Sequence, residues 1–474
     1  MADKDLYYYT FGDKKLVEQI ERFTKHVASL QLSPSDVYNI LMTMYENIDW
    51  KAHIHNATIP STVDYLVNVS SRTCNPNVSF PHQKENWHQI AQLVGSPIEN
   101  VKQFSKIVRQ IQEIVYADKL GNRKLPLLSE KHDNLLSSLF EEPSISLQCP
   151  GKSKFFSHTL PFIKYLVEQT PYILSRSKQM GQCSTLALND GMLHILTQIK
   201  TSDSNGLLTT KTVKLTKLEC ACILANSFFC TWSRCDERGQ GRKYEMPSIN
   251  LDTLYNNIYP SSAAKLLMII HYFERLEQRG FVSIENSGYV TFVRKHVRSF
   301  KLDDLSCTKF KEVEAFTEGS IEDSVKEIQA DFANKYIGGG VIHGGYTQEE
   351  IRFCLSPETI VSRLFTEMLN DNESFLIVGS EQFSTHSGYG KQLKFACDFN
   401  DNSFVLDGEM KAFPSQIIAF DSLYLEASEK LTQWQPALID REILKAFSAF
   451  IVIPEIPILD TINTGNWGCG AFGW

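Results

Sequence analysis

Two adjacent acids after a glycine-rich run are the residues best suited to chemistry. The run GGGVIHGGYTQEE spans residues 338–350, with five glycines in its first eight residues and Glu349 and Glu350 at its end. Glycine permits positive φ values and close approach of a ligand to the main chain, so successive N–H groups can converge on an anion such as a diphosphate. Neighbouring carboxylates could divide the cleavage of a glycosidic bond, one handling the proton of the leaving oxygen and the other holding sugar hydroxyls.

The same acids also fit an ordinary helix start. Residues 347–350 (TQEE) have the spacing of a capping box, in which the third residue after the cap returns to the cap N–H. Glu349, in the first turn, could simply complement the helix dipole. Spacing alone therefore favours capping over catalysis for Glu350.

Three further features could add to a site around these acids. Asp331 ends the predicted strand EIQADFA, although an ordinary strand-end carboxylate explains it equally well. Residues 464–473 (TGNWGCGAFG) combine four glycines with two aromatics, which indicates either a second close-approach loop for phosphate and ring or a simple turn around a buried tryptophan. The stretch SGYG could swing Tyr389 over a ligand, or form an exposed hairpin tip.

Composition indicates a globular chain of several units. Its 474 residues exceed what one core usually organises, and 43% are hydrophobic against 22% charged. The formal net charge of -8 argues against direct DNA binding through a broad basic surface. An anionic ligand remains compatible, because backbone N–H groups can bind phosphate without net positive charge.

The sequence also indicates a compartment. The start MADKDLYYYT has neither a basic leader nor an apolar segment, and no stretch approaches the ~18 apolar residues of a membrane helix, so we expect no secretory signal and no membrane contact. The 11 cysteines are scattered and odd in number, which is typical of a reducing compartment, nucleus or cytoplasm. The densest group, between Cys220 and Cys235, lacks zinc-site spacing and predicts buried structural thiols.

The periodicity of apolar residues predicts a helical half followed by an α/β half. After residue 282, short β-like runs alternate with helical ones, which is typical of helices packed on a mixed sheet. An amphipathic helix is expected over 97–118, and 50–95 show no clear period and are expected to be a linker. The predicted units are a strand–helix–helix segment over 1–49, a linker and helical region over 50–150, a mainly helical accessory domain over 151–285 and an α/β domain over 286–474.

Several of these stretches together resemble the poly(ADP-ribose) glycohydrolase family. The spacing GGG, seven residues, then QEE resembles the family signature, and DFANKYIGGG, LFTEMLNDNE, SGYG and TGNWGCGAFG are similar to it too. The stretch ECACILANSFFCTW resembles the accessory domain, so the likeness covers roughly residues 150–473. The resemblance implies a macrodomain-like α/β fold that hydrolyses ribose–ribose bonds of poly(ADP-ribose) and releases ADP-ribose. It implies a monomer without metal or cofactor, acting on the polymer and on poly(ADP-ribosyl)ated proteins.

The resemblance also assigns roles to residues. It implies that Glu350 is the acid/base, that Glu349 holds the ribose hydroxyls, and that Asp331 supports the site. The implied substrate-binding residues are Ile321, Glu322 and Gln348 at the adenine, Gly338, Gly339 and Gly340 at the diphosphate and ribose, Asn334 beside the acids, Tyr389 closing over the ligand, and Asn466, Gly470, Ala471 and Phe472 at the diphosphate.

One departure concerns the order of segments. Residues 5–48 resemble the family's C-terminal strand and helices, placed first, as in a circular permutation or a gene model joined across tandem copies. If this segment docks as the outer strand, Phe11 would supply the aromatic near the adenine. The helix that joins the two pieces in the family has no counterpart, which predicts weakened ligand affinity with the acids intact.

Two other functions compete with hydrolysis of the polymer. The chain could be an ADP-ribose-binding module with weakened or lost turnover, or it could remove single ADP-ribose units from proteins. The presence of both Glu349 and Glu350 favours the enzyme, because a pure binding module would not need them.

Overall fold

The architecture comes from a computed structural model. It describes residues 78, 80–116, 127–128, 133–140, 155–174, 193–200, 207–233, 246–257, 259–280, 283–284, 287–298, 312–324, 326–407, 410–425, 430–454, 456, 459 and 461–472. The segment predicted over residues 1–49, including Phe11, lies outside the described residues, so the predicted outer strand stays a prediction.

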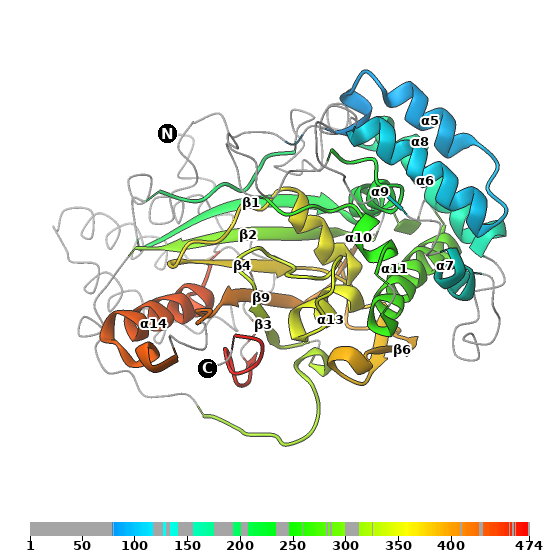
Figure 1. Ribbon diagram of the computed structural model, residues 1–474. Helices are drawn as coiled ribbons and strands as arrows, with labels where there is room; N and C mark the ends of the chain where they lie inside the picture. Colours follow the sequence, from blue (N-terminus) through cyan, green and yellow to red (C-terminus); the bar gives the residue numbers. More distant parts are fainter. Residues whose placement is uncertain are drawn as a thin grey trace, which may run out of the picture.

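A six-stranded mixed sheet forms the centre of the molecule, with strand order β1-β2-β4-β9-β3-β10 (Figure 1). Its strands are β1 Leu208–Thr216, β2 Tyr289–Val297, β3 Ile328–Ala333, β4 Glu373–Val378, β9 Gln416–Asp421 and β10 Ile462–Asn463. β3 runs parallel to both β9 and β10, and the other neighbours are antiparallel. Smaller hairpins join β5 Ser384–Ser387 to β6 Lys394–Asp398 and β7 Val405–Asp407 to β8 Met410–Ala412. This is the mixed sheet with flanking helices that the sequence predicts.

Helices cover both faces of this sheet. The α-helices are α5 Trp87–Gly95, α6 Val101–Tyr116, α7 Asp133–Phe140, α8 Leu160–Ile173, α9 Lys217–Phe228, α10 Asp252–Tyr255, α11 Pro260–Arg279, α13 Gln348–Leu355 and α14 Pro436–Phe450. Short 3-10 helices lie at Pro81–Gln83, Ile321–Asp323, Pro357–Leu364 (η13), Gly390–Gln392 and Lys430–Trp434, and a π-helix at Phe155–Thr159. In Figure 1, α14 lies apart from the helical block formed by α5 to α11.

Alternation along the strands decides which residues face each layer, because successive side chains of a strand point to opposite faces. In β9, Ile418 and Phe420 join the small core that contains Ala449 of α14. Ile417 and Ala419 join the large core shared with α9, α11 and α13. In β3, Ala330 lies on the α14 side and Ala333 on the other side, so Asp331 shares the face of Ala333 and points toward α13.

The structure corrects two expectations about the helical half. Residues 87–95, expected within a linker, form α5, which buries Ile90 and Val94 four residues apart on one face. The expected helical region 151–285 also contains β1, which pairs with β2 along its whole length. This region therefore adds the edge strand of the sheet. The predicted buried thiols are confirmed at Cys220, Cys222 and Cys230.

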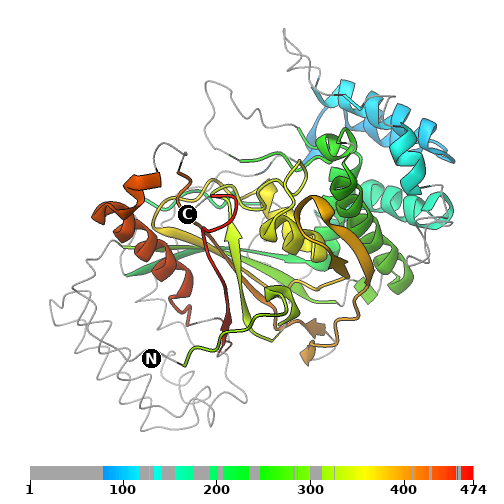
Figure 2. The ribbon, with the colours of Figure 1, turned by 60° about the horizontal axis from the view of Figure 1, so that its bottom comes forward.

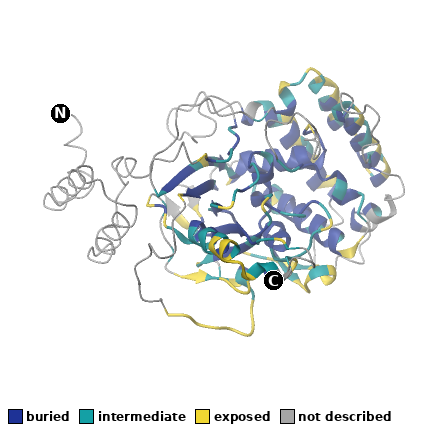
Figure 3. Cartoon of the chain, turned by 60° about the vertical axis from the view of Figure 1, so that its left-hand side comes forward, coloured by how far each residue is buried: buried dark blue, intermediate teal, exposed yellow. Residues whose placement is uncertain are grey.

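Buried residues are concentrated in the sheet and in the helices packed on it. Figure 3 shows the helical block and the strands as mostly buried, while residues 312–319 form an exposed strap that leads toward β3. No helix among the described residues is long and apolar enough to cross a membrane.

A buried ion pair joins α9 to the α/β half. The Lys217 ammonium lies 2.7 Å from a carboxylate oxygen of Glu358 in η13, and the two side chains are 1% and 0% exposed. Burial raises the pKa of Glu358, and the charge of Lys217 opposes that rise. Removal of the lysine would leave a buried carboxylate without its cation, which is far more costly than the loss of a surface pair.

Lys217→Met is therefore expected to lower the free energy of unfolding by about 3–5 kcal/mol in urea titrations. The double variant Lys217→Met/Glu358→Gln should recover part of this loss, because it removes the unpaired charge. A loss below about 1 kcal/mol in the single variant, the usual value for an exposed pair, would contradict the role assigned to this contact.

Candidate active site

Three acids from two elements meet beneath the glycine-rich loop. Asp331 projects from β3, and Glu349 and Glu350 lie in the first turn of α13. Their exposed fractions are 0%, 3% and 6%. Their charges act on one another, since Glu350 raises the pKa of Asp331, and Asp331 and Glu350 both raise that of Glu349. The structure thus brings together the acids that the sequence singled out.

The N–H groups of the glycine loop bind the protein's own carboxylates. Gly338 N–H donates to Glu349 Oε1 at 2.7 Å, and Gly340 N–H donates to Glu350 Oε1 at 2.8 Å. The intervening Gly339 N–H donates to the carbonyl of Tyr336. An external diphosphate could use these N–H groups only by displacing a carboxylate. The loop presents converging N–H groups, as the sequence indicates, but in this structure their acceptors are the carboxyl oxygens of Glu349 and Glu350.

Steric contact explains why residue 339 is glycine. Its φ of +44° lies in the left-handed region, and a Cβ there would lie 2.5 Å from both Glu349 Oε2 and Glu350 Oε1. A Cβ on Gly345 would likewise lie 2.5 Å from Glu350 Oε1. Because real Cβ contacts do not come this close, the carboxylates can reach the loop backbone only where side chains are absent.

Glu350 is also the capping residue that the spacing predicts. Its Oε2 accepts hydrogen bonds from the backbone N–H and the hydroxyl of Thr347, both at 2.8 Å. Its other oxygen meets Gly340, so three donors fix the carboxylate in one orientation. The helix cap and the candidate catalytic group are therefore the same side chain in two roles.

Asp331 has the least favourable environment for a charged carboxylate among the three acids. Neither of its carboxylate oxygens has a hydrogen-bond partner among the described residues. Burial raises its pKa well above the usual range, the charges of Glu350 and Glu322 raise it too, and Arg352 opposes them. For Glu349 burial also raises the pKa well above normal, while N–H donors from Asn334 and Gly338 work against it. Asp331 and Glu349 therefore hold their protons at pH values at which exposed carboxyl groups release them.

Asp331→Asn is expected to stabilise the fold by about 1–3 kcal/mol at pH 8, because it removes an unpartnered buried charge. The folded-state pKa lies above the unfolded value, so between the two the folded state binds more protons and stability falls as pH rises. Thermal melts from pH 5 to pH 9 should show this fall in the wild type and a smaller fall in the variant, where Glu349 still contributes. A variant less stable than wild type at pH 8 would contradict the account.

Tyr389 reaches the acids from an exposed turn. It lies on the loop between β5 and β6 and is 59% exposed. Its hydroxyl accepts from the Gln348 backbone N–H, and partial burial together with the charges of Glu350 and Glu322 raises its pKa. The exposed hairpin tip that the sequence allows is therefore present, and closure of Tyr389 over a ligand stays a prediction.

Gln348 has a structural contact that the sequence did not reveal. Its side-chain amide accepts from Phe332 N–H at 2.9 Å and donates to the Ala330 carbonyl at 3.0 Å. These groups lie on the edge of β3 beyond the two residues paired with β10. The amide of Gln348 thus completes the ladder of β3 and fixes α13 against the strand that carries Asp331.

The loop after β10 lies beside the same edge of the sheet. In Figure 2 the red C-terminal segment passes between α14 and the yellow stretch that contains α13. Trp467 anchors it: its ring packs at a tilt against Phe420, with ring centroids 4.8 Å apart, and its indole N–H donates to the Phe420 carbonyl at 3.1 Å. Phe472 packs edge-on against Tyr424. The described residues that the resemblance assigns here, Asn466, Gly470 and Ala471, are exposed.

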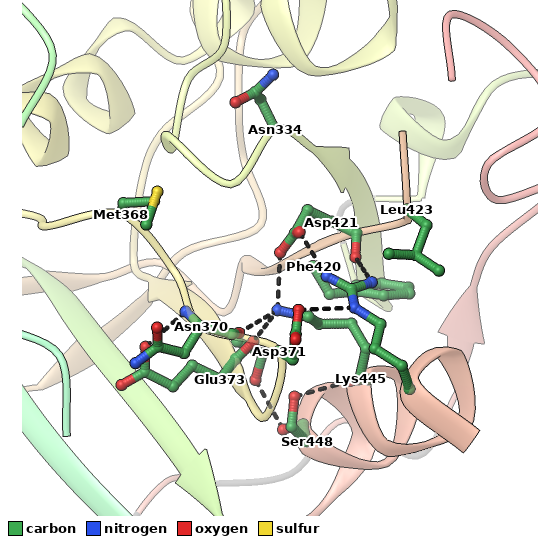
Figure 4. Close-up of polar contacts among 12 residues, drawn as sticks. Asn334, Met368, Asn370, Asp371, Glu373, Phe420, Asp421, Leu423, Lys445 and Ser448 are labelled. Carbon is green, nitrogen blue, oxygen red and sulfur yellow. Dashed lines mark hydrogen bonds and ion pairs between the residues drawn. The ribbon is translucent and has the colours of Figure 1, made fainter. Parts of the chain in front are cut away.

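A polar network from α14 holds the C-terminal end of β9, which lies beside the end of β3 (Figure 4). Asp421 pairs with Ala333 in the β3–β9 register, and Ala333 directly precedes Asn334 in the chain. Arg441 and Lys445 each reach an Asp421 carboxylate oxygen at 2.8 Å. The Asn334 backbone N–H in turn donates to Glu349 Oε2 at 2.9 Å, so this network supports the edge on which Glu349 is held.

Two buried cations beneath the loop escaped the sequence analysis. Lys265 of α11 and Arg363 of η13, 0% and 1% exposed, donate to carbonyls of residues 337–345. The available signal was a charged residue inside an apolar helical run, as in SAAKLLMII and ETIVSRLF. The described residues contain no group of three or more His, Cys, Asp or Glu side chains that could hold a metal ion.

Two models of one protein family match the helical region and the α/β region of this chain. Residues 147–294 match a family described as poly(ADP-ribose) glycohydrolase, helical domain, and residues 301–474 match poly(ADP-ribose) glycohydrolase, macro domain fold. The chain belongs to the poly(ADP-ribose) glycohydrolase family. The macro domain match contains the three acids, and the helical domain match contains Lys265.

Curated relatives of this family are similar over parts of their length. The chain is 32% identical to poly(ADP-ribose) glycohydrolase 1 of Arabidopsis thaliana, over 63% of this chain and 51% of that protein. It is 28% identical to a probable poly(ADP-ribose) glycohydrolase 2 of the same plant, over 71% and 69%. It is 34% identical to poly(ADP-ribose) glycohydrolase 1 of Caenorhabditis elegans, over 44% of this chain and 27% of that protein. The aligned region thus spans about half the length of the first of these relatives.

Proposed function

We propose that this chain hydrolyses the ribose–ribose O-glycosidic bonds of poly(ADP-ribose) and releases ADP-ribose. The observation that carries the proposal is the pair Glu349 and Glu350, both buried, both held by glycine-loop N–H groups, with Asp331 behind them. Cleavage of a glycosidic bond needs an acid that protonates the leaving oxygen and stabilisation of an oxocarbenium-like centre. Family membership and paired carboxylates together favour this reaction over simple binding.

In the proposed reaction Glu350 acts twice. Its carboxylic acid donates a proton to the departing ribose oxygen while the bond to the anomeric carbon breaks. The resulting carboxylate then takes a proton from a water molecule whose oxygen bonds to that carbon, which restores the acid. Glu349, held by Gly338 and Asn334, binds the ribose hydroxyls, and the neighbouring negative charge favours the cationic transition state.

Contacts around the acids support the proposed binding residues. Ile321, Glu322 and Gln348 would flank the adenine, Gly338 to Gly340 would line the ribose and diphosphate, and Gly470 to Phe472 would contact the diphosphate. Tyr389 would close over the ligand, consistent with its hydroxyl at the start of α13. The substrates would be the polymer and poly(ADP-ribosyl)ated proteins, bound by a monomer without direct contact to DNA. The free cysteines fit the nucleus or the cytoplasm.

Tyr389→Ala is expected to weaken ADP-ribose binding about 5- to 100-fold, because stacking of a base on an aromatic ring contributes about 1–3 kcal/mol. Tyr389→Phe keeps the ring and should bind nearly as wild type in titration calorimetry. Since residue 389 is exposed, both variants should melt as wild type does. Equal affinity of all three proteins would remove Tyr389 from the proposed site.

The choice of substrate separates the competing functions. Purified poly(ADP-ribose) and a protein carrying single ADP-ribose units are incubated with the chain in parallel, and released ADP-ribose is quantified. The proposal predicts that ADP-ribose is released from the polymer and that the single ADP-ribose units stay attached to the protein. Comparable removal of the single units would instead support the protein-deconjugating function, and polymer that binds without shortening would support the binding module.

A further inference from the structure

Arg363 contacts the back of the two peptide groups that bind the catalytic acids. Its Nη1 donates to the Gly339 carbonyl at 2.7 Å and to the Ile337 carbonyl at 3.3 Å. The Gly339 carbonyl shares its peptide group with Gly340 N–H, the donor to Glu350. The Ile337 carbonyl shares its peptide group with Gly338 N–H, the donor to Glu349. One guanidinium nitrogen thus reaches both carboxylates, each through a single peptide unit.

This arrangement orients and polarises both peptide groups. In a trans peptide the C=O and N–H point in opposite directions, so a cation at the oxygen and an anion at the N–H align the same dipole. Hydrogen bonds in series strengthen one another, and bonds to charged groups are the stronger kind. Arg363 is 1% exposed and its Nε donates to the Ser248 carbonyl at 3.0 Å, so packing fixes its position.

Lys265 acts on the same loop in a different way. Its ammonium donates to the carbonyls of Gly340, His343 and Gly345 at 3.1, 2.6 and 2.6 Å. None of these carbonyls shares a peptide group with Gly338 N–H or Gly340 N–H. Lys265 therefore holds the shape of the loop, whereas Arg363 acts on the two donor groups themselves.

We propose that Arg363 is a positioning residue for hydrolysis, acting on Glu349 and Glu350 through the 337–338 and 339–340 peptide groups. Loss of the guanidinium frees these peptides to rotate, which loosens both carboxylates and withdraws positive potential from them. The kinetic consequences rest on the proposed function, and the effect on the amide groups does not.

The test compares two conservative substitutions of buried arginines. Arg363→Lys keeps the charge but loses the planar fork that fixes the peptides. Arg294→Lys is the matched control, because Arg294 is 0% exposed and also donates to carbonyls, those of Leu196 and Met368. Its carboxylate partner is Glu373 rather than Asp331, Glu349 or Glu350. Arg363→Gln is a second variant should the lysine variant fold poorly, and melting temperatures report the folding of each.

The first readout is independent of activity. With ¹⁵N-glycine labelling, the Gly338 and Gly340 amide protons, each bonded to a carboxylate, are expected at low field in the wild type and in Arg294→Lys. In Arg363→Lys and Arg363→Gln both signals should move upfield and exchange faster with solvent. Unchanged positions and exchange rates in folded Arg363 variants would overturn the proposal, whether or not the wild type hydrolyses the polymer.

The second readout is the pH dependence of kcat for polymer hydrolysis. Variants of Arg363 should lose on the order of 10- to 100-fold in kcat, as for outer partners of other site residues, with little change in KM. The acid limb, which we assign to the ionisation of Glu349, should also move to higher pH, because burial already raises the pKa of Glu349 and the variant weakens the Gly338 N–H bond that opposes this rise. Other charged or titratable groups surround Glu349 and Glu350 and also influence this limb. They are Asp331, Glu322, Arg352, Lys265, Cys354 and Tyr389.

The two readouts distinguish failure of the inference from failure of the proposed function. A merely structural role would lower the melting temperature, as in Arg294→Lys, without moving the acid limb or the glycine signals. Wild-type kcat and an unmoved limb in Arg363→Lys would contradict the inference. No hydrolysis by the wild type would contradict the proposed function, and the glycine signals would still decide the role of Arg363.

Discussion

Glu350→Gln is expected to lower kcat for poly(ADP-ribose) hydrolysis by about 10²- to 10⁴-fold while ADP-ribose still binds. The amide has nearly the shape of the carboxylic acid, but it cannot donate a proton to the leaving oxygen or accept one from water. Loss of general acid–base catalysis has this magnitude in other enzymes. Single-turnover release of ADP-ribose measures the rate, and calorimetric titration with ADP-ribose measures binding.

The control must separate catalysis from helix capping, because Glu350 also caps α13. Glu219 offers the match, since it closes the capping box of α9 with Thr216 N–H at 2.7 Å and is 6% exposed, as is Glu350. Gln also serves at the third position of a capping box, so Glu219→Gln and Glu350→Gln should each keep most of the cap and lose similar, small amounts of stability. Only Glu350→Gln should lose turnover. If the two variants lost activity equally, capping would be the whole role of Glu350.

Gly339→Ala is expected to reduce kcat about 10²-fold or more with little loss of solubility or fold. The added methyl carbon would lie 2.5 Å from Glu349 Oε2 and from Glu350 Oε1, so both side chains must move. A displacement of about 1 Å at reacting groups can cost 10²-fold in rate. The measurement is kcat for polymer hydrolysis together with the melting temperature.

Gly280→Ala separates contact with the acids from backbone strain. Gly280 ends α11 with a φ of +74°, and none of the described atoms lies within 4 Å of the position of its Cβ. Alanine there should cost about 1–3 kcal/mol through its unfavourable backbone alone and leave kcat unchanged. A Gly339→Ala enzyme with wild-type kcat would show that the acids tolerate displacement from the loop.

The α/β half of the fold could be predicted because the centres of its inner strands β4 and β9 are short apolar runs. Both strands are almost fully buried, and Ile417 and Ile418 of β9 face two different cores, so apolar residues follow one another without a polar interruption there. β1 was missed because the strand that it pairs with, β2, lies about eighty residues later in the chain. The helix η13 was expected as an ordinary helix but is a 3-10 helix.

The candidate site was predictable in its acids and not in their partners. Glu349 and Glu350 are adjacent in sequence, and Asp331 lies in a recognisable strand, within β3 rather than at the end that the sequence predicts. The destination of the glycine N–H groups depends on side-chain rotamers across the loop, which spacing does not report. Lys265 and Arg363 meet the loop through contacts between helices packed in one core, and only the tertiary fold brings them there.

The most direct test of the central claim is a single-turnover reaction with purified, length-defined poly(ADP-ribose). Wild type and Glu350→Gln are compared at enzyme concentrations that bind the polymer fully, and chain length and free ADP-ribose are followed over time. The account predicts that the wild type converts the polymer to ADP-ribose and that Glu350→Gln binds it without shortening it. Polymer left intact by the wild type, or shortened at the wild-type rate by Glu350→Gln, would contradict it.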